Sequence, residues 1–291
     1  MSQSPGAPQP GSSGPAAAPK SRAGRNLPAA IAVGVVMLGI ALASLYYQLW
    51  IFIVVVVAAV AIGTDELATA MRSKGIQLTK TPLITAAVLL PVLAFEWGPA
   101  QLLMGFGLLF LAMVVYRLFR HGIDDFVRDS TASGFVLSYA PLMGGFAALI
   151  AASPDGADRV LTFIILSVAS DVGGYAAGVL FGRHPMAPAI SPKKSWEGFA
   201  GSVTLQVVLG ASLFVWLLDS DWWRGALVGA VMTVTATLGD FVESAIKRDL
   251  GIKDMSNLLP GHGGLMDRLD SLIPNTVVAY ALFAVALGGV S

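Results

Sequence analysis

The sequence predicts an all-α fold: a polytopic integral membrane helical bundle of about nine transmembrane helices, with the N-terminus in the cytoplasm and the C-terminus outside. Three observations lead to this prediction. Hydrophobic residues make up 55% of the 291 residues and the mean hydropathy is +0.73, beyond the range of ordinary soluble domains. Apolar runs close to bilayer length recur along the chain. The Lys and Arg residues between those runs fall almost entirely on one side.

The first 26 residues are rich in Pro, Gly, Ser and Ala and contain too few large apolar side chains to bury a core. They predict a disordered cytoplasmic tail, residues 1–26. The rest of the chain, residues 27–291, is expected to form a single transmembrane domain. A secretory signal peptide is the alternative, because Ala41-Leu42-Ala43 looks like a cleavage site. The apolar run that contains this tripeptide is too long for a typical signal peptide, so we interpret it as the first span.

Nine apolar runs are expected to cross the membrane. Their approximate bounds are 27–46, 48–63, 82–96, 99–116, 131–152, 160–181, 199–218, 225–246 and 272–290. The third run is short and contains Pro82 and Pro91, which makes it the weakest of the nine. The eighth is apolar only as far as Gly239 and is expected to continue as a polar helix.

The charges between the spans support this count. If the sides alternate from a cytoplasmic N-terminus, all but two of the 18 Lys and Arg residues lie inside; the exceptions are Arg159 and Arg224. This asymmetry follows the positive-inside rule, and a missing or extra span would destroy it. Arg117 and Arg128 are assigned to this asymmetry alone, so replacing either by Lys is expected to be nearly silent.

The overall composition names few partners. The absence of Cys excludes disulfides and thiolate metal sites. The formal net charge is zero, and no nucleic acid is expected as a partner. The informative charge is local, because Lys, Arg and Asp gather in residues 244–270 between two apolar runs. Charge is unfavourable near lipid, so this segment is expected to act on something polar at the membrane surface.

Four polar residues follow the apolar part of the eighth run. Asp240, Glu243, Ser244 and Lys247 have the i, i+3, i+4, i+7 spacing that shares one face of a helix. One interpretation is a functional site at the membrane boundary. The other is a helix that simply reaches water, with a local ion pair between Glu243 and Lys247.

A Gly-rich turn follows, Pro260–Gly264, with His262 at its centre. A helix is expected to begin near Leu265, and its N-terminus would favour phosphate. Asp267 and Asp270 are three residues apart and face the same way. Carboxylates from this helix and from Asp240 could converge on Mg²⁺, which proteins hold with one or two carboxylates plus substrate phosphates. The alternative is a Gly-rich connector with solvated charges.

A third segment precedes the seventh run and reads Ser191-Pro192-Lys193-Lys194-Ser195-Trp196-Glu197-Gly198. Adjacent lysines beside a hydroxyl and a Gly suit phosphate. A positive anchor with an interfacial Trp is also common, and composition alone favours that interpretation.

Asp171 lies inside the sixth run, and an intramembrane carboxylate is a candidate functional residue that needs a partner or a polar cavity. Gly174, Gly178 and Gly182 repeat every four residues, which favours close helix packing and a structural role.

These segments together resemble the phosphatidate cytidylyltransferase family, also called CDP-diacylglycerol synthases. The family signature is matched here by Ser244, Lys247-Arg248, Lys253-Asp254, His262-Gly263-Gly264 and Asp267-Arg268-Leu269-Asp270. The upstream block from Asp171 to Gly198 also fits, so the specific resemblance covers roughly residues 170–271. One departure is Val179, where many members have a basic residue.

The resemblance implies that CTP and phosphatidate condense to CDP-diacylglycerol, the activated intermediate of phospholipid biosynthesis, and pyrophosphate. It implies Mg²⁺ or another divalent cation as the cofactor, and phosphatidate in the cytoplasmic leaflet as the lipid substrate. The expected location is the cell membrane, with several spans and an active site that faces the cytoplasm. A homodimer stays open.

The resemblance also assigns roles to residues. The catalytic residues are expected to be Asp240, Asp267, Lys247, Arg248 and Arg268. The substrate-binding residues are expected to be Ser191, Lys193, Lys194, Glu197, Ser244, Lys253, Asp254, His262, Gly263, Gly264 and Asp270. The metal ligands are expected to be Asp240, Asp267 and, more weakly, Asp171.

Two other functions stay open. The same site chemistry would serve a CTP-dependent transferase that acts on an ether lipid or a polyprenol. A membrane transporter is the second alternative, with Asp171 and Asp240 as coupling carboxylates. Transporters often contain internal repeats, and this sequence shows no clear repeat. Its charge is concentrated at one face, which favours surface chemistry on a lipid headgroup.

Overall fold

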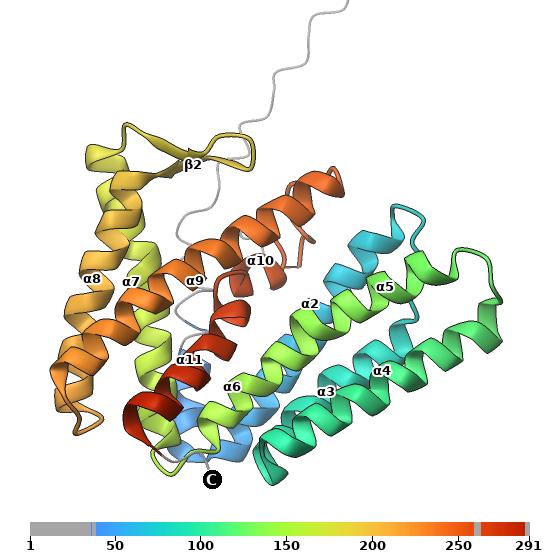
Figure 1. Cartoon of the computed structure of the whole chain (residues 1–291), viewed down its shortest axis with the longest axis horizontal. Coiled ribbons are helices and arrows are strands. Elements are labelled where there is room, and N and C mark those ends of the chain that lie inside the picture. Colours follow the sequence, from blue (N-terminus) through green and yellow to red (C-terminus); the bar gives the residue numbers. More distant parts are fainter. Residues whose placement is uncertain (1–35, 37–38, 259–262, 289–291) are drawn as a thin grey trace, which may run out of the picture.

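The computed structural model describes residues 36, 39–258 and 263–288, and this part of the chain is mostly helical (Figure 1). Eight helical segments in it are long and apolar enough to cross a membrane. The helices are α2 (Leu49–Arg72), α3 (Lys80–Trp97), α4 (Pro99–His121), α5 (Phe126–Leu137), the π-helix η1 (Ser138–Leu142), α6 (Met143–Ala151), α7 (Gly156–Phe181), α8 (Trp196–Trp216), α9 (Trp222–Asp249), α10 (Met266–Leu269) and α11 (Leu272–Leu287). The run α5–η1–α6 and the pair α10–α11 each count as one candidate span.

The eight segments correspond to the second to ninth expected spans. The first expected span, 27–46, lies mostly outside the described residues, although residues 39–47 are helical. The predicted tail, 1–26, lies wholly outside them. The third expected span is a complete helix, α3, with Pro91 inside it. The eighth continues as a helix to Asp249, as the sequence predicted.

A short antiparallel hairpin departs from the all-α prediction. Strands β1 (Pro185–Ala187) and β2 (Ser191–Ser195) pair between α7 and α8, with Pro185 opposite Ser195 and Ala187 opposite Ser191. The backbone N–H of Trp196 donates to the carbonyl of His184 at 3.0 Å and closes the hairpin at its base. The sequence lacks the apolar alternation that identifies strands, which is why only a loop was expected here.

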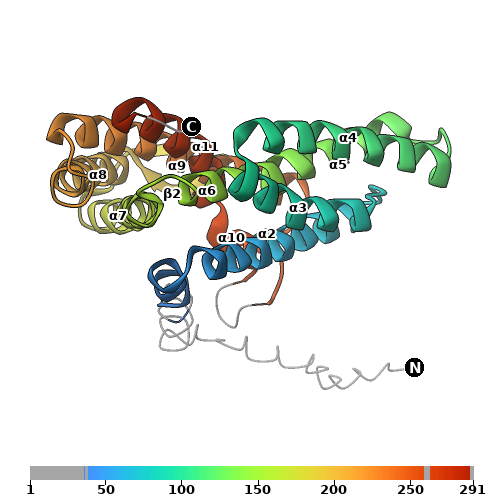
Figure 2. The ribbon, with the colours of Figure 1, turned by 90° about the horizontal axis from the view of Figure 1, so that it is seen from below.

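The helices form two groups joined by a central layer. In both views α7, α8 and α9 lie on one side and α3, α4 and α5 on the other, with α2, α6 and α11 between them (Figures 1 and 2). The hairpin, the polar end of α9 and α10 all lie toward one end of the bundle (Figure 1). The charged segments that are distant in sequence therefore meet at one end.

Glycines allow α7 to pack closely on α8. A Cβ at Gly173 would lie 2.7 Å from the carbonyl oxygen of Gly201, and one at Gly174 would lie 2.6 Å from Oγ of Ser202. Real Cβ atoms do not approach so closely, so at Gly173 the backbone of α8 would have to move, whereas at Gly174 the Ser202 hydroxyl would have to move. The expected structural role is confirmed at Gly174, whereas a Cβ at Gly178 would make only ordinary contacts, the nearest at 3.7 Å.

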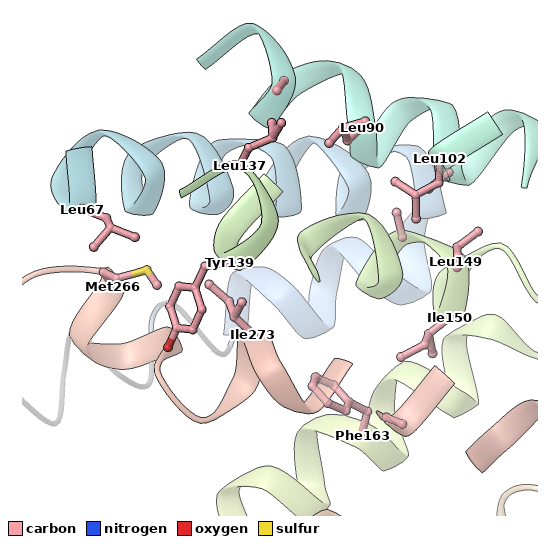
Figure 3. Packing of buried hydrophobic residues seen from close by; sticks show 14 of the residues in the cluster. Leu67, Leu90, Leu102, Leu137, Tyr139, Leu149, Ile150, Phe163, Met266 and Ile273 are labelled. Carbon is pink, nitrogen blue, oxygen red and sulfur yellow. The ribbon is translucent and has the colours of Figure 1, made fainter. Parts of the chain in front are cut away.

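A buried apolar cluster holds α10 in place. Met266 is completely buried and lies near Leu67 of α2, Tyr139 of η1 and Ile273 of α11 (Figure 3). The short helix α10, which bears the last signature residues, therefore packs against the N-terminal half of the protein. Within η1, Pro141 interrupts the helical hydrogen bonds, because proline has no backbone N–H to donate.

A buried ion pair joins α4 to α5. Nη2 of Arg117 lies 2.9 Å from Oδ2 of Asp129, and the two residues are 3% and 0% exposed. The guanidinium also donates to the carbonyls of Gly122 and Asp124, at 3.1 and 2.7 Å, in the turn between the helices. The expectation that Arg117 serves only the charge asymmetry is wrong, since it holds this turn together.

We expect Arg117→Lys to lower the thermal unfolding midpoint of the detergent-purified protein. Lys keeps the charge but loses the planar fork that donates in three directions, at a cost of about 1–3 kcal/mol. Arg120→Lys is the control, because Arg120 is exposed on the same helix. Equal midpoints for the two variants would contradict the structural role.

Candidate active site

The polar end of α9 presents one continuous face. Glu243 is completely buried, and the ammonium of Lys247 pairs with its carboxylate, which confirms the local pair that the spacing predicted. Neither oxygen of Glu243 makes an aligned hydrogen bond. Lys247 Nζ also lies 2.8 Å from Oδ1 of Asp267. One turn before Glu243, Asp240 forms an ion pair with Lys194 of β2.

Asp267 connects α9 to the Gly-rich segment. Its Oδ1 accepts from Lys247, and its Oδ2 accepts the backbone N–H groups of Gly264 and Met255, each at 2.8 Å. The residue is only 6% exposed. Hydrogen bonds to an ionised acceptor are about twice as strong as neutral ones, so this carboxylate holds three separate segments together.

The start of α10 differs from the expected phosphate site. The backbone N–H groups of Leu265 and Met266 donate to Glu66, and that of Gly264 donates to Asp267. The expectation of a phosphate site here is therefore wrong, because the carboxylates of Glu66 and Asp267 already accept these backbone donors. Gly263 has φ +82°, which agrees with the predicted tight turn, and His262 lies outside the described residues.

The hairpin brings the adjacent lysines to the end of α9. Lys194 pairs with Asp240 and lies 5.2 Å from the ring centre of Phe241. Glu197 has a local partner, because its Oε1 lies 2.6 Å from Nδ1 of His184 and its Oε2 accepts two backbone N–H groups of the same turn. Its assignment to substrate stays a prediction.

Three adjoining cavities lie in this region of the described structure. The acidic cavity, about 360 Å³, is lined by Asp171, Lys194, Asp240, Glu243, Ser244, Lys247, Asp254, Asp267, Arg268 and Asp270. The basic cavity, about 510 Å³, is lined by Ile190, Ser191, Pro192, Lys193, Ser244, Lys247, Arg248, Ile252 and Lys253. The amphipathic cavity, about 310 Å³, has walls from α7, the hairpin, α8 and α9, including Asp171, Tyr175, Lys193, Lys194, Phe199 and Asp240.

Most of the predicted site residues line these cavities. Asp171 meets Asp240 and Asp267 in the acidic cavity, although they come from three different spans. Glu197, Gly263 and Gly264 line none of the three. Val179 is 67% exposed on α7 and also lines none of them, so its departure from the signature leaves these walls unchanged.

The comparison with protein families agrees with this geometry. The model of the cytidylyltransferase family matches residues 28–286, which includes the N-terminal spans. The chain belongs to the cytidylyltransferase family. It is 42% identical over 276 residues to the phosphatidate cytidylyltransferase of Mycobacterium leprae, covering 90% of this chain and 88% of that protein. The phosphatidate cytidylyltransferase of Mycobacterium tuberculosis is 40% identical over 89% of this chain and 83% of its own length.

A more distant relative extends the match beyond bacteria. The chloroplastic phosphatidate cytidylyltransferase 5 of Arabidopsis thaliana is 31% identical, over 80% of this chain and 65% of that protein. The similarity therefore covers most of the membrane domain of this cytidylyltransferase, well beyond the signature segment.

The donor chemistry of the acidic cavity suits Mg²⁺ bound together with phosphate. No group of three or more Asp, Glu or His side chains in the described residues is close enough to form a protein-only cage. Mg²⁺ does not require one, because it usually takes one or two carboxylates and completes its shell with phosphate and water. Asp240 and Asp267 each have lone pairs beyond those used by their lysines.

Glu66 lies beside the candidate site, and the sequence did not single it out. It lies on α2 and is 7% exposed. Its Oε2 accepts the N–H of Met266 at 2.7 Å, and its Oε1 accepts from the N–H of Leu265 at 3.0 Å and from Oγ of Ser256 at 2.5 Å. The one signal was its place beside Asp65, directly after an apolar run. Glu66 thus positions the segment that bears Asp267.

We expect Glu66→Gln to loosen the start of α10. An amide oxygen can replace one acceptor of the carboxylate, but the amide N–H₂ would face a backbone donor, at a cost of about 1–3 kcal/mol. Hydrogen exchange should become faster at the amides of Leu265 and Met266. The control is Asp65→Asn, because Asp65 is 50% exposed and pairs with Lys80 instead. Unchanged exchange in Glu66→Gln would refute the positioning role.

Proposed function

We propose that this cytidylyltransferase transfers the cytidylyl group of CTP to phosphatidate and gives CDP-diacylglycerol and pyrophosphate. The observation that carries the proposal is the convergence of carboxylates and cations from α7, β2, α9 and α10 in one cavity at one end of a membrane bundle. Relatives named phosphatidate cytidylyltransferase, which align with about nine-tenths of the chain, support the choice of substrates.

The residues suit a reaction that depends on charge neutralisation. Phosphoryl transfer needs little covalent work from side chains and is accelerated by positioning and by stabilising charge on the phosphate oxygens. We assign four cations to the phosphates: Lys193, Lys247, Arg248 and Arg268. The hydroxyl of Ser191 would donate a hydrogen bond to a phosphate oxygen. No general base is required, because a phosphate monoester is already mostly ionised at neutral pH.

A divalent cation, Mg²⁺ by preference, is part of the proposal. Asp240 and Asp267 would hold it, and Asp171 is a weaker ligand of the same cavity. Bound there, the ion would withdraw electron density from the phosphate oxygens of CTP. Ser244, Lys253, Asp254 and Asp270 are proposed to contact substrate or to order the residues that do.

Family membership decides against the transporter hypothesis. A transferase acting on an ether lipid or a polyprenol phosphate would use the same phosphate chemistry, so the lipid has to be tested directly.

Purified protein supplied with CTP, phosphatidate and Mg²⁺ should release pyrophosphate and CDP-diacylglycerol in equal amounts. Mass spectrometry of the lipid identifies the product, and parallel reactions with a polyprenol phosphate or an ether-lipid phosphate test the alternatives. Faster turnover of either alternative lipid would overturn the choice of phosphatidate.

Asp240→Asn and Asp267→Asn should each lower kcat/KM at least about a hundredfold, since the loss of a transition-state contact commonly has this effect. Each variant should also need more Mg²⁺ for half-maximal rate. Asp249→Asn is the control, because Asp249 is exposed on α9 and lines none of the three cavities. Near-normal rates and Mg²⁺ dependence in both site variants would remove the metal assignment.

We infer a topology of nine spans, with the N-terminus and the active site on the cytoplasmic side of the cell membrane and the C-terminus outside. Phosphatidate would then be taken from the cytoplasmic leaflet. The distribution of Lys and Arg supports this orientation. The contacts of α9 separate its cations without fixing the side: Lys247 at one end meets Asp267, whereas Arg224 at the other end donates to the carbonyl of Ala286 at 2.5 Å.

Cysteine labelling tests the orientation, because the chain has no native Cys. An impermeant maleimide should leave Lys193→Cys unlabelled in intact cells and label it in inverted membrane vesicles. Ser220→Cys, in the loop between α8 and α9, should show the reverse. Labelling of Lys193→Cys in intact cells would reverse the topology.

A further inference from the structure

Each of the three cavities shares lining residues with the other two. Ser191 and Lys193 line both the amphipathic and the basic cavity. Asp171, Lys194 and Asp240 line both the amphipathic and the acidic cavity. Ser244 and Lys247 line both the acidic and the basic cavity. The carboxylate-rich cavity therefore adjoins both an amphipathic and a cationic cavity, and these two also meet each other at the hairpin.

We propose that these cavities divide the two substrates between them. The basic cavity takes the β- and γ-phosphates of CTP, the acidic cavity takes the α-phosphate, and the amphipathic cavity takes the phosphate headgroup of the lipid. This inference rests on the proposed function and adds to it the place of each substrate.

The basic cavity has the chemistry of a polyphosphate site. Four of its lining residues are cations, Lys193, Lys247, Arg248 and Lys253, and two are serines. Among the described residues that line it, none is acidic and none is aromatic. It therefore suits a compact polyanion such as pyrophosphate better than a nucleobase or an acyl chain.

The amphipathic cavity has the chemistry of a lipid headgroup site. Tyr175 of α7 is 76% exposed and lies beside exposed Val172 and Val179 on the outer face of that span. Lys193 and Lys194 from the hairpin supply cations on the inner wall. A lipid can thus present its phosphate to the lysines while its acyl chains stay against the apolar face of α7.

This arrangement fits an in-line displacement. A phosphatidate oxygen in the amphipathic cavity forms a bond to the α-phosphorus of CTP. The bond from that phosphorus to the oxygen bridging the α- and β-phosphates breaks, and its electron pair leaves with pyrophosphate into the basic cavity. Attacking and leaving oxygens must lie on opposite sides of the phosphorus, so the lipid phosphate and the pyrophosphate need separate subsites, as the proposal assigns them.

Two exposed residues, each lining one cavity only, allow a crossed test. Lys253 lines the basic cavity and Tyr175 lines the amphipathic one. In mixed micelles, Lys253→Gln should raise the KM for CTP and the inhibition constant of pyrophosphate at least about fivefold, with the KM for phosphatidate nearly unchanged. Tyr175→Ala should raise the KM for phosphatidate by a similar factor and leave the KM for CTP and the inhibition constant of pyrophosphate nearly unchanged. Arg183→Gln removes an exposed cation that lines neither cavity and should change none of these constants.

The division of substrates is overturned if the two variants change both KM values alike, or if Lys253→Gln mainly raises the KM for phosphatidate. In either case, turnover by the wild-type protein still upholds the proposed function. If the wild-type protein forms no CDP-lipid, the proposed function fails and binding decides the rest. Calorimetric binding of pyrophosphate with Mg²⁺ that weakens in Lys253→Gln but not in Tyr175→Ala supports the basic cavity. Equal binding by both variants overturns it.

Discussion

The ion pair between Lys247 and Asp267 is the interaction on which the candidate site depends. It joins the end of α9 to the short helix that precedes the last span, and both side chains are largely withdrawn from solvent, at 17% and 3% exposure. Removing one partner of a buried pair leaves the other charge without compensation in a medium of low dielectric constant. The pair also keeps the signature segment, which contains most of the predicted substrate contacts, against the membrane bundle.

Each carboxylate at the centre of the site already has a cation beside it: Lys194 for Asp240, and Lys247 for Asp267 and Glu243. The lysines thereby offset part of the negative charge that six acidic side chains bring to this cavity, which limits the cost of placing acids at a membrane boundary. A nucleotide with its metal contains both kinds of charge. In the proposed reaction its cation would satisfy the acids while its phosphates would satisfy the lysines, so the loaded site would balance these charges with new partners.

The sequence predicted the fold well where the signal was long and periodic. Eight of the nine expected spans appear as helices, and residues of four separate segments meet as the signature implied. It failed where one polar residue acts through a distant partner. Glu66 and Arg117 lie at the ends of apolar runs, where a charge ordinarily reaches water or obeys the positive-inside rule. Only the tertiary contacts with Met266 and Asp129 reveal their roles.

The hairpin between α7 and α8 explains why its two adjacent lysines are not equivalent. Successive side chains of a strand alternate in direction. Both lysines line the amphipathic cavity, but Lys194 pairs with Asp240 whereas Lys193 also lines the basic cavity. A single residue inserted or deleted before them would exchange their directions without changing the composition of the segment. Under the proposed function, the length of this loop matters as much as its composition, so an alignment gap here would mark altered chemistry even where both lysines are retained.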